Sequence, residues 1–445
     1  NATLTSLADT APELRRPWPR PALEELLSLL GAGQPAVDVI EAMDRTGLWG
    51  RLFPEWGAVR DLPPRDRAHV WTVDRHLVEA AAQAARLTTT VGRPDLLLLG
   101  ALLHDLGKGR GADHSVVGAA LAEQIGQRLG LPDPDVAILR AMVRHHLLLP
   151  HTATRRDLED PTTAQRVVDT LGGDPTLLEL LVVLAEADSL ATGPGVWTEW
   201  RATLIHNLAE RCRAVLSGRP LPAPEPLSEE HRALAERSAA SGSLHVTATV
   251  PNNAAAGPAA ATTVTIVTPG RPGVLALAAG VLALHSLQVH SADFRLAEPP
   301  RGGSAAVDTF TVSPRFGRPP DVALLRQDLV RALDGSLQLS DRLAAKERDY
   351  GETPASGIET RVLWFDDEAT GAVILELRTT DHRIGLLYRV AAALESSAVT
   401  VRWARVVTLG SSVVDSFCIT GSDGHSALSP EERELVERAV LNAAQ

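Results

Sequence analysis

The C-terminal half of the chain contains an internal repeat, and few folds are compatible with it. A Thr-x-x-Arg-x-Gly-x-Leu pattern that begins at Thr268 returns 112 positions later, at Thr380. A Val-Asp-x-Phe pattern at 307–310 returns at 414–417, which is 107 positions later. Because the two spacings differ, the copies must differ in the length of one loop. A segment repeated in this way is one supersecondary unit used twice.

Each copy combines alternating and helical patterns in the same order. Residues 262–268 and 372–380 alternate between apolar and polar side chains, as half-buried strands do. In each copy a helix-like stretch follows, then two further strand candidates and a closing helix. We therefore predict two βαββαβ units, over residues 243–336 and 371–445, with a linker at 337–370.

The N-terminal half has a different pattern, because its apolar residues recur at the spacing of helices. Residues 69–216 contain five helix-length stretches with almost no strand alternation, which predicts an all-α domain. Residues 1–68 are also helical and are expected to be a lead-in or the remnant of an upstream region. Residues 217–242 hold four prolines and a helix, as expected of a stiff linker. The predicted fold class is multidomain, with one all-α domain followed by two α+β units.

Composition limits the class of protein further. With 445 residues and two cysteines, the chain is expected to form several domains without a disulfide framework, in the cytoplasm. Its formal net charge of −12 argues against a nucleic-acid or membrane partner held mainly by electrostatics. The chain begins with Asn1 and not with methionine, which leaves open whether Asn1 is the native start.

The stretch ALLHDLGKGRGADHS, at 101–115, brings a His-Asp pair to the end of an apolar run. Imidazoles and carboxylates are suitable ligands for a divalent metal that hydrolyses phosphoesters, and His104 and Asp105 provide one of each. Two further ligands must come from elsewhere. His76, on an earlier helix, is one candidate. Asp188 is the other, since a carboxylate at the end of an apolar run is costly to bury without a partner.

Each of these residues also has an ordinary structural explanation when it is considered alone. A single His-Asp pair is common, and a lone His76 is more often a surface or core histidine than a ligand. A lone Asp188 could cap a turn through Ser189. The order His…His-Asp…Asp on separate helices of an all-α domain is far more specific, and it favours a metal site.

More cations and histidines surround the pair. Lys108 and Arg110 are candidates to bind phosphate oxygens, although cations at a helix end also complement the helix dipole. His114 and one of the neighbours His145 and His146 could hold a second metal ion, about 3.5–4 Å from the first. Alternatively, they could orient a ligand of the first ion without touching that ion.

Three glycines, Gly107, Gly109 and Gly111, alternate with these cations. They could let the backbone approach a substrate closely, or they could simply end the helix. The GxxxxGK[ST] pattern is absent, so no phosphate-binding loop of that kind is predicted.

The order of a histidine, a His-Asp pair and a later aspartate resembles the HD superfamily of metal-dependent phosphohydrolases. The resemblance implies one divalent ion at least (Mn, Mg, Fe or Zn) and favours His146 over its neighbour. It implies four metal ligands: His76, His104, Asp105 and Asp188. The catalytic residues predicted with them are Asp105, which would orient the attacking water, Lys108 and Arg110.

The two repeated units resemble ACT domains, which are sensors that commonly bind amino acids. The strand-to-helix turn DHRIGLL is close to the turn of that family, and PGRPGVL in the first copy retains part of it. A helix N-terminus at such a turn can accept a ligand carboxylate. The resemblance implies these effector-binding residues: Asp381, His382, Arg383, Gly385 and Leu386 in the second copy, and Arg271 and Gly273 in the first.

An HD domain followed by two ACT domains resembles the C-terminal portion of the bifunctional uridylyltransferase/uridylyl-removing enzymes of PII nitrogen signalling, of the actinobacterial type. TVDRHL, VRHHLLLPHTATRRD and AEADSLATGP also carry this resemblance. It implies hydrolytic removal of UMP, or of AMP, from a tyrosine of the PII protein, regulated by glutamine bound to the ACT units. It also allows a homodimer through those units. No GS-x-x-R…DxD-like pattern of the family's upstream nucleotidyltransferase domain occurs before residue 69.

Two other functions remain as alternatives. A guanosine-tetraphosphate hydrolase is another HD protein with a C-terminal ACT domain. That family has an acidic pair shortly after its His-Asp pair, where this chain has Gly107 and Lys108. A non-catalytic amino-acid sensor with an inactive HD fold is the other alternative, and it would bind no metal.

Overall fold

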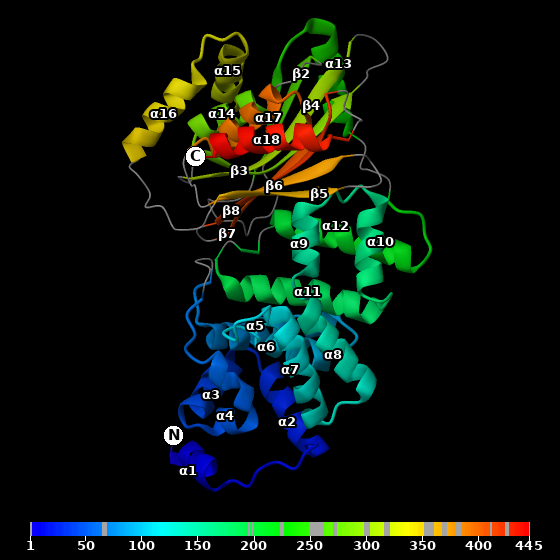
Figure 1. The fold of residues 1–445 in the computed structure, drawn as a ribbon, viewed down its shortest axis with the longest axis vertical. Coiled ribbons are helices and arrows are strands. Elements are labelled where there is room, and N and C mark those ends of the chain that lie inside the picture. The colour runs from blue at the N-terminus through cyan, green and yellow to red at the C-terminus, as the bar shows by residue number, and fades with distance from the viewer. Residues whose placement is uncertain are drawn as a thin grey trace. The chain divides into compact units, whose positions relative to one another are not determined.

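Helices make up the first part of the chain and a large sheet with helices the last part (Figure 1). The computed structural model describes residues 2–64, 69–194, 196–197, 199–222, 227–249, 262–269, 274–297, 303–315, 321–350, 360–366, 372–379, 384–409, 412–422 and 427–444. Two compact units are present: Asn1–Ala153 with Thr163–Pro222, and Thr154–Thr162 with Ala223–Gln445. Within the described ranges, no helix has both the length and the apolarity needed to cross a bilayer.

The first unit begins with short helices around an aromatic core. They are α1 (Ala2–Thr10), α2 (Arg20–Gly31), α3 (Gln34–Arg45), α4 (Leu48–Leu52) and the 3-10 helix η1 (Pro54–Ala58). The rings of Trp49 and Phe53 are buried with centroids 4.7 Å apart, and Trp56 meets Trp49 edge-on at 5.7 Å. Such aromatic contacts bury large apolar surfaces and hold short helices that are marginal alone.

The remaining helices lie mostly in the first unit, and one of them, α6, is apolar on all sides. They are α5 (Val73–Arg86), η2 (Thr88–Thr90), α6 (Pro94–Leu103), α7 (His114–Leu129), α8 (Asp133–His145), α9 (Leu148–Arg155), α10 (Pro161–Thr170), α11 (Pro175–Thr192) and α12 (Glu199–Leu216). All residues of α6 from Leu96 to Leu103 are buried, as expected of a central helix. Helices α5 and α11 pack against α6 and against each other (Figure 1). This predicted all-α region is confirmed.

The second unit is built on one antiparallel sheet, which has eight strands among the described residues. The strands are β1 (His245–Thr249), β2 (Thr262–Pro269), β3 (Leu287–Ala297), β4 (Ala305–Pro314), β5 (Arg361–Asp366), β6 (Val373–Thr379), β7 (Thr400–Leu409) and β8 (Ser412–Thr420). Their order across the sheet is β1-β2-β4-β3-β7-β8-β6-β5. The two copies of the repeat are therefore the two halves of this sheet.

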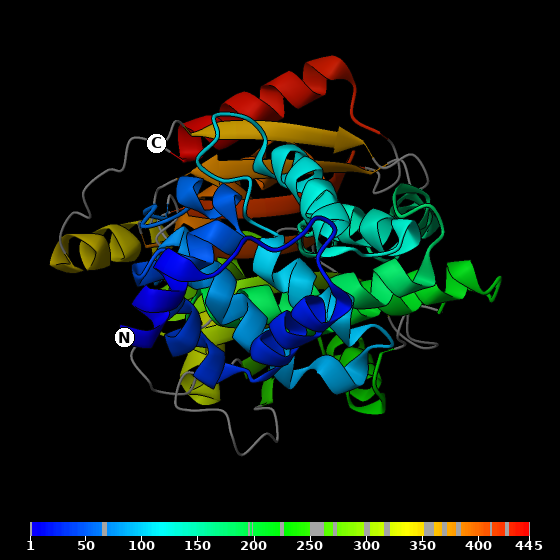
Figure 2. The same cartoon turned by 90° about the horizontal axis from the view of Figure 1, so that it is seen from below.

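Helices of both halves cover one face of the sheet and share one hydrophobic core with it. They are α14 (Val274–Leu284), α15 (Val322–Leu333), α16 (Leu339–Tyr350), α17 (Leu386–Ser396) and α18 (Pro430–Ala443). In Figure 2 the red helix α18 lies along the orange strands of the second half. On the other face, α13 (Glu229–Ser241) packs Leu234 and Ala235 against Val267 of β2 and Val307 of β4. The α+β class predicted for this region is confirmed.

The order of elements within each half differs from the predicted βαββαβ. A strand precedes each unit, as β1 or β5, and pairs with β2 or β6 at the outer edge of the sheet. After α15 the chain continues into α16 and not into a closing strand. The segment HVTAT of β1 alternates over five residues, which is near the lower limit at which alternation indicates a strand. The outermost strand of each half therefore precedes the unit in the sequence, whereas the predicted order placed that strand at the end of the unit.

Each half buries one aspartate on the helix-covered face of the sheet, at the same place in the repeat. Asp308 lies opposite Ile266, and Asp415 lies opposite Leu377. Burial raises the pKa of both carboxyls to about 7, because the charged form loses its hydration. Among the residues that the structure describes, none forms a hydrogen bond with the Oδ1 atom of Asp415. A buried carboxyl without a partner should destabilise the fold whenever it is charged.

The burial of Asp415 predicts that replacing it by an uncharged residue stabilises the fold more as the pH rises. In the unfolded chain an aspartate ionises near its ordinary pKa of about 4, whereas Asp415 stays protonated up to about pH 7. Between these values a rise in pH stabilises the unfolded state relative to the folded state. We compare the free energy of unfolding of Asp415→Asn with that of the parent chain at each pH. We expect this difference to shift in favour of the variant by about 2–3 kcal/mol between pH 5 and pH 8.

Chemical denaturation of both proteins at the two pH values measures this difference. Asp341→Asn, at an exposed position of α16, is the control. If the gain of Asp415→Asn is the same at pH 5 and pH 8, then Asp415 does not titrate differently in the folded and unfolded chain.

Candidate metal centre

The predicted site lies in the first unit, where α5, α6 and α11 meet. His76 is in the second turn of α5, and Asp188 is near the end of α11. His104 and Asp105 directly follow α6, whose buried apolar sides fix the position of its last turn. The Nδ1 atom of His104 lies 2.9 Å from the carbonyl oxygen of Ala101 in that turn. Because a carbonyl only accepts, Nδ1 carries a proton and Nε2 points into the site.

The structure brings together the four residues that were predicted as ligands. The Nε2 atoms of His76 and His104 are 3.3 Å apart. Asp188 Oδ1 lies 3.0 Å from His76 Nε2 and 3.4 Å from His104 Nε2. Asp105 Oδ2 lies 3.5 Å from His104 Nε2 and 3.9 Å from His76 Nε2. His76, His104 and Asp188 thus form one compact metal-type group, and Asp105 Oδ2 faces both imidazoles of that group.

Asp105 also faces a second pair of histidines. Its Oδ1 atom lies 3.6 Å from Nε2 of His114 and 3.6 Å from Nε2 of His146. The Nδ1 atom of His146 is 2.9 Å from the carbonyl oxygen of Val143, so its Nε2 is free to face Asp105. The neighbouring His145 belongs to none of the metal-type groups found among the described residues. Asp105 therefore lies between two sets of imidazoles.

The polar atoms of the cluster lack the partners that a metal-free site would need. Two imidazole Nε2 atoms facing each other cannot both present lone pairs without a proton or a cation between them. Asp105 is buried, and no described residue donates a hydrogen bond to its Oδ1 atom. Buried groups of this kind are normally paired or coordinate a metal. The cluster therefore fits a divalent metal ion.

Charges within the cluster shift the pKa values of its members. Burial disfavours a charged His104, but the carboxylates of Asp105 and Asp188 outweigh burial and raise the pKa of His104 to about 9. Burial opposes ionisation of Asp188, yet His104 and His76 hold its pKa well below the usual value. Burial lowers the pKa of His146 to about 4, so at neutral pH its ring is uncharged, as a ligand must be.

The two cations predicted to bind phosphate differ in their surroundings. Lys108 Nζ lies 2.5 Å from Asp105 Oδ2, and its side chain is partly exposed. The guanidinium of Arg110 instead donates to the backbone carbonyl of Glu55, at 2.7 Å. Lys108 is thus at the site, whereas one nitrogen of Arg110 is directed to η1. A catalytic role for Arg110 stays a prediction.

His69 was not predicted and lies beside the cluster. Its ring contacts the ring of His76 edge-on, with centroids 5.1 Å apart. It forms a third metal-type group with His76 and Asp105, and its buried Nδ1 atom has no hydrogen-bond partner within the described ranges. Burial lowers the pKa of His69, which favours the neutral ring. The sequence gives only a spacing of seven residues before His76, and that spacing crosses the start of α5.

Most residues predicted to bind an effector lie outside the described residues. These are Arg271 and Gly273 in the first copy, and Asp381, His382 and Arg383 in the second. Gly385 is described, and its φ of +84° explains why glycine occupies the position before α17. Leu386 is buried at the first position of that helix.

Comparisons with known proteins agree with this arrangement. Residues 73–193 match the model of the HD domain family. The chain is 48% identical over 457 residues to a bifunctional uridylyltransferase/uridylyl-removing enzyme of Mycobacterium tuberculosis, covering 100% of this chain and 54% of the relative. It is 42% identical over 470 residues to an enzyme of the same name from Streptomyces coelicolor, covering 98% of this chain and 56% of the relative. The chain thus spans about half the length of these curated relatives.

Proposed function

The chain contains an HD domain and corresponds along its whole length to the C-terminal part of the bifunctional uridylyltransferase/uridylyl-removing enzymes, and on this basis we propose a hydrolase. The proposed reaction is the metal-dependent removal of a nucleotidyl group, UMP or AMP, from a tyrosine of the PII signal protein. The convergence of His76, His104, Asp105 and Asp188 carries this proposal.

The four convergent side chains would hold the first metal ion, and His114 and His146 would hold a second ion on the other side of Asp105. When bound, divalent cations supply Lewis-acid activation of water and neutralise charge on phosphoryl oxygens. The ability of Asp105 to face both groups of imidazoles supports two ions over one.

The protein's own side chains would complete the catalytic site. Asp105, as a hydrogen-bond acceptor, would orient the attacking water toward phosphorus. Lys108, which is partly exposed beside Asp105, would donate a hydrogen bond to a phosphoryl oxygen as negative charge develops there. The phosphorus–oxygen bond to tyrosine would then break, and the tyrosine phenolate would leave.

We further propose that glutamine regulates this reaction through the ACT-like units. The helix N-terminus at Gly385 is suited to an amino-acid carboxylate, because backbone N–H groups there have no partner within the helix. A ligand can change activity only through its different affinity for two arrangements of the protein. Glutamine would therefore bind the hydrolytically active arrangement more tightly.

Nucleotide release from modified PII protein tests the proposed function. We expect the chain, supplied with Mn²⁺ or Mg²⁺, to release UMP from uridylylated PII or AMP from adenylylated PII. A chelator should reduce release to the rate of the uncatalysed reaction, because the residues that remain cannot replace the charge of the cation. Glutamine should raise the rate.

Guanosine tetraphosphate serves as the alternative substrate in the same assay. Its hydrolysis without any release from PII would replace the proposed function by the guanosine-tetraphosphate hydrolase. If neither substrate reacts with any divalent metal, the non-catalytic sensor is supported.

A further inference from the structure

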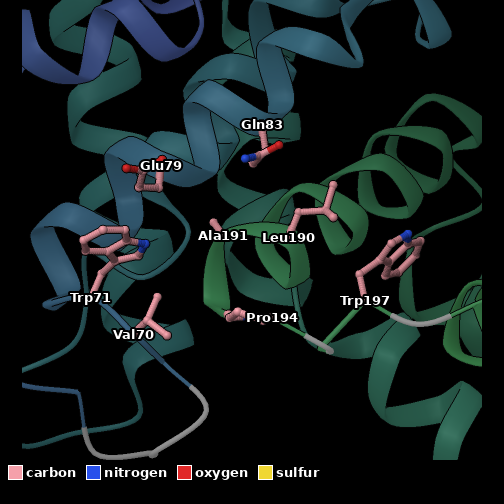
Figure 3. A pocket seen from close by; sticks show the side chains of 9 residues that line it. Val70, Trp71, Glu79, Gln83, Leu190, Ala191, Pro194 and Trp197 are labelled. Carbon is pink, nitrogen blue, oxygen red and sulfur yellow. The ribbon is translucent and has the colours of Figure 1, made fainter. Parts of the chain in front are cut away.

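A pocket of about 390 Å³ lies in the first unit, between the start of α5 and the end of α11 (Figure 3). Its size is within the range of sites that hold small ligands. In Figure 3, Trp71 and Trp197 stand on opposite sides, with Leu190 and Ala191 of α11 between them. The residues that line it are Val70, Trp71, Glu79, Gln83, Leu190, Ala191, Gly193, Pro194 and Trp197.

The pocket lies near the candidate metal centre, because Val70 and Trp71 directly follow His69, whose ring contacts the ring of His76. On α5, Glu79 and Gln83 follow His76 by three and seven residues, so all three lie on one side of the helix. On α11, Ala191 follows Asp188 by three residues and lies on the same side for the same reason. A substrate bound at the cluster would thus have the pocket beside it.

Apolar groups gather at this pocket while remaining exposed. In the described part of the chain nine large apolar side chains are exposed, and three of them line the pocket: Val70 at 55%, Trp71 at 39% and Leu190 at 40%. Exposed apolar groups gathered around a concavity mark a binding site more often than isolated ones do. We therefore expect an apolar surface of a bound molecule to cover these three side chains in the working enzyme.

Ion pairs hold the polar groups of the pocket wall in place, and the positive and negative charges of these pairs nearly cancel. The guanidinium of Arg75 lies 4.6 Å from the ring centre of Trp71, which fixes one face of that ring. Arg75 also binds Glu79 at 2.6 Å and Glu41, and Arg45 pairs with Glu41 at 3.7 Å, so two guanidiniums compensate the two carboxylates. Gln83 offers an amide that can both donate and accept. The wall thus combines a flat aromatic surface with one adaptable hydrogen-bonding group.

We propose that this pocket binds the nucleoside of the nucleotidyl group that the enzyme removes. With the phosphate at the metal centre, the base stacks against Trp71 and Gln83 bonds to the base edge or the ribose. Aromatic side chains stack nucleobases of any sequence, and an amide matches their mixed donors and acceptors. A tyrosine side chain would need no such amide. The proposal rests on the proposed function, since it assigns the nucleoside part of that substrate.

Two chromogenic diesters test the proposal on the metal-loaded chain. One is the p-nitrophenyl ester of UMP or of AMP, and the other is methyl p-nitrophenyl phosphate, which has no nucleoside. We expect Trp71→Ala to lower kcat/KM for the nucleotide ester, relative to the nucleoside-free ester, about tenfold, which corresponds to one lost stacking contact. The fall in kcat/KM should come from a higher KM. Trp71→Phe should recover most of the lost kcat/KM. Val39→Ala, at an exposed apolar position of α3, is the matched control.

Each outcome bears on either the pocket or the reaction. If Trp71→Ala lowers kcat/KM equally for both esters, the pocket does not bind the nucleoside. If the variant impairs only release from modified PII and leaves both esters unaffected, the pocket receives the PII surface, and the proposal is overturned.

A wild-type chain that hydrolyses neither ester and releases no nucleotide from modified PII contradicts the proposed function and not the pocket. The pocket is then tested by calorimetric titration of UMP and AMP into the metal-loaded chain. Binding that weakens about tenfold in Trp71→Ala supports the nucleoside site, whereas no binding, or equal binding, refutes it.

Discussion

Replacing His104 and Asp105 together by alanine is expected to abolish nucleotide release, with a loss of at least about 1000-fold. The cluster would lose two of its four convergent ligands, and Asp105 is also the residue between the two groups of imidazoles. Removal of metal-assisted charge stabilisation costs several kcal/mol in the transition state, and about 4 kcal/mol corresponds to such a factor.

The double variant should remain folded because it removes opposite charges together. With the pKa of His104 near 9 and that of Asp105 below its usual range, the metal-free pair is an imidazolium and a carboxylate. Removing one partner of a buried pair would leave an uncompensated charge, whereas removing both avoids that cost. His76 Nε2 and Asp188 Oδ1, which lie 3.0 Å apart, remain as partners of each other in the double variant.

The measurement combines nucleotide release, metal content and far-UV circular dichroism. His145→Ala is the matched control, because His145 is next to His146 and belongs to none of the metal-type groups among the described residues. It should keep its activity and its metal. Release at the parent rate by the double variant would show that the reaction takes place elsewhere.

Three members of the cluster break a local pattern of the sequence, whereas His76 does not and was predicted only from the order of residues in the HD superfamily. His104 and Asp105 interrupt an apolar run, and Asp188 is a carboxylate that ends another. His69 could not be found in this way. It precedes α5, outside any periodic segment, and only the folded chain brings its ring to His76. Residues that reach a site from irregular segments leave no periodic signal.

The fold was predictable to the level of repeated units but not to the level of the complete sheet. The polar and apolar residues of β2 and β6 indicated strands, although in the structure most residues of both strands are buried and not half-buried as predicted. The pairing of Ala292 with Ala404 joins the halves through β3 and β7, and any exposed strand edge could have made such a contact. Which edges pair depends on tertiary packing, so the sequence pattern could not determine it.

The three alternating glycines show why a motif needs its surroundings. From the sequence, Gly107 and Gly111 had the same two explanations. In the structure, a methyl group at Gly107 would collide with the carbonyl oxygen of His114 and lie 2.6 Å from the backbone nitrogen of Gly118. Gly107 is thus the point where the turn after α6 packs directly against the backbone of α7. Gly111 has a φ of +76° and open space around it.

We therefore expect Gly107→Ala to be the more harmful of the two substitutions. The methyl group must push α7 away, and with it His114, which lies 3.6 Å from Asp105. Insertion of one methyl group into close backbone packing should cost about 3 kcal/mol and displace the catalytic residues, with a loss of activity of about 100-fold or more.

Gly111→Ala is the matched control. The new methyl group has open space there, and only the positive φ of residue 111 is unfavourable for alanine, which should lower the free energy of unfolding by about 1 kcal/mol. Thermal unfolding and nucleotide release should therefore separate the two variants clearly, since His114 stays in place when only Gly111 is changed. Equal effects of the two substitutions would mean that the turn after α6 can move away from α7 without disturbing the ligands, and that the glycine at 107 serves only to end the helix.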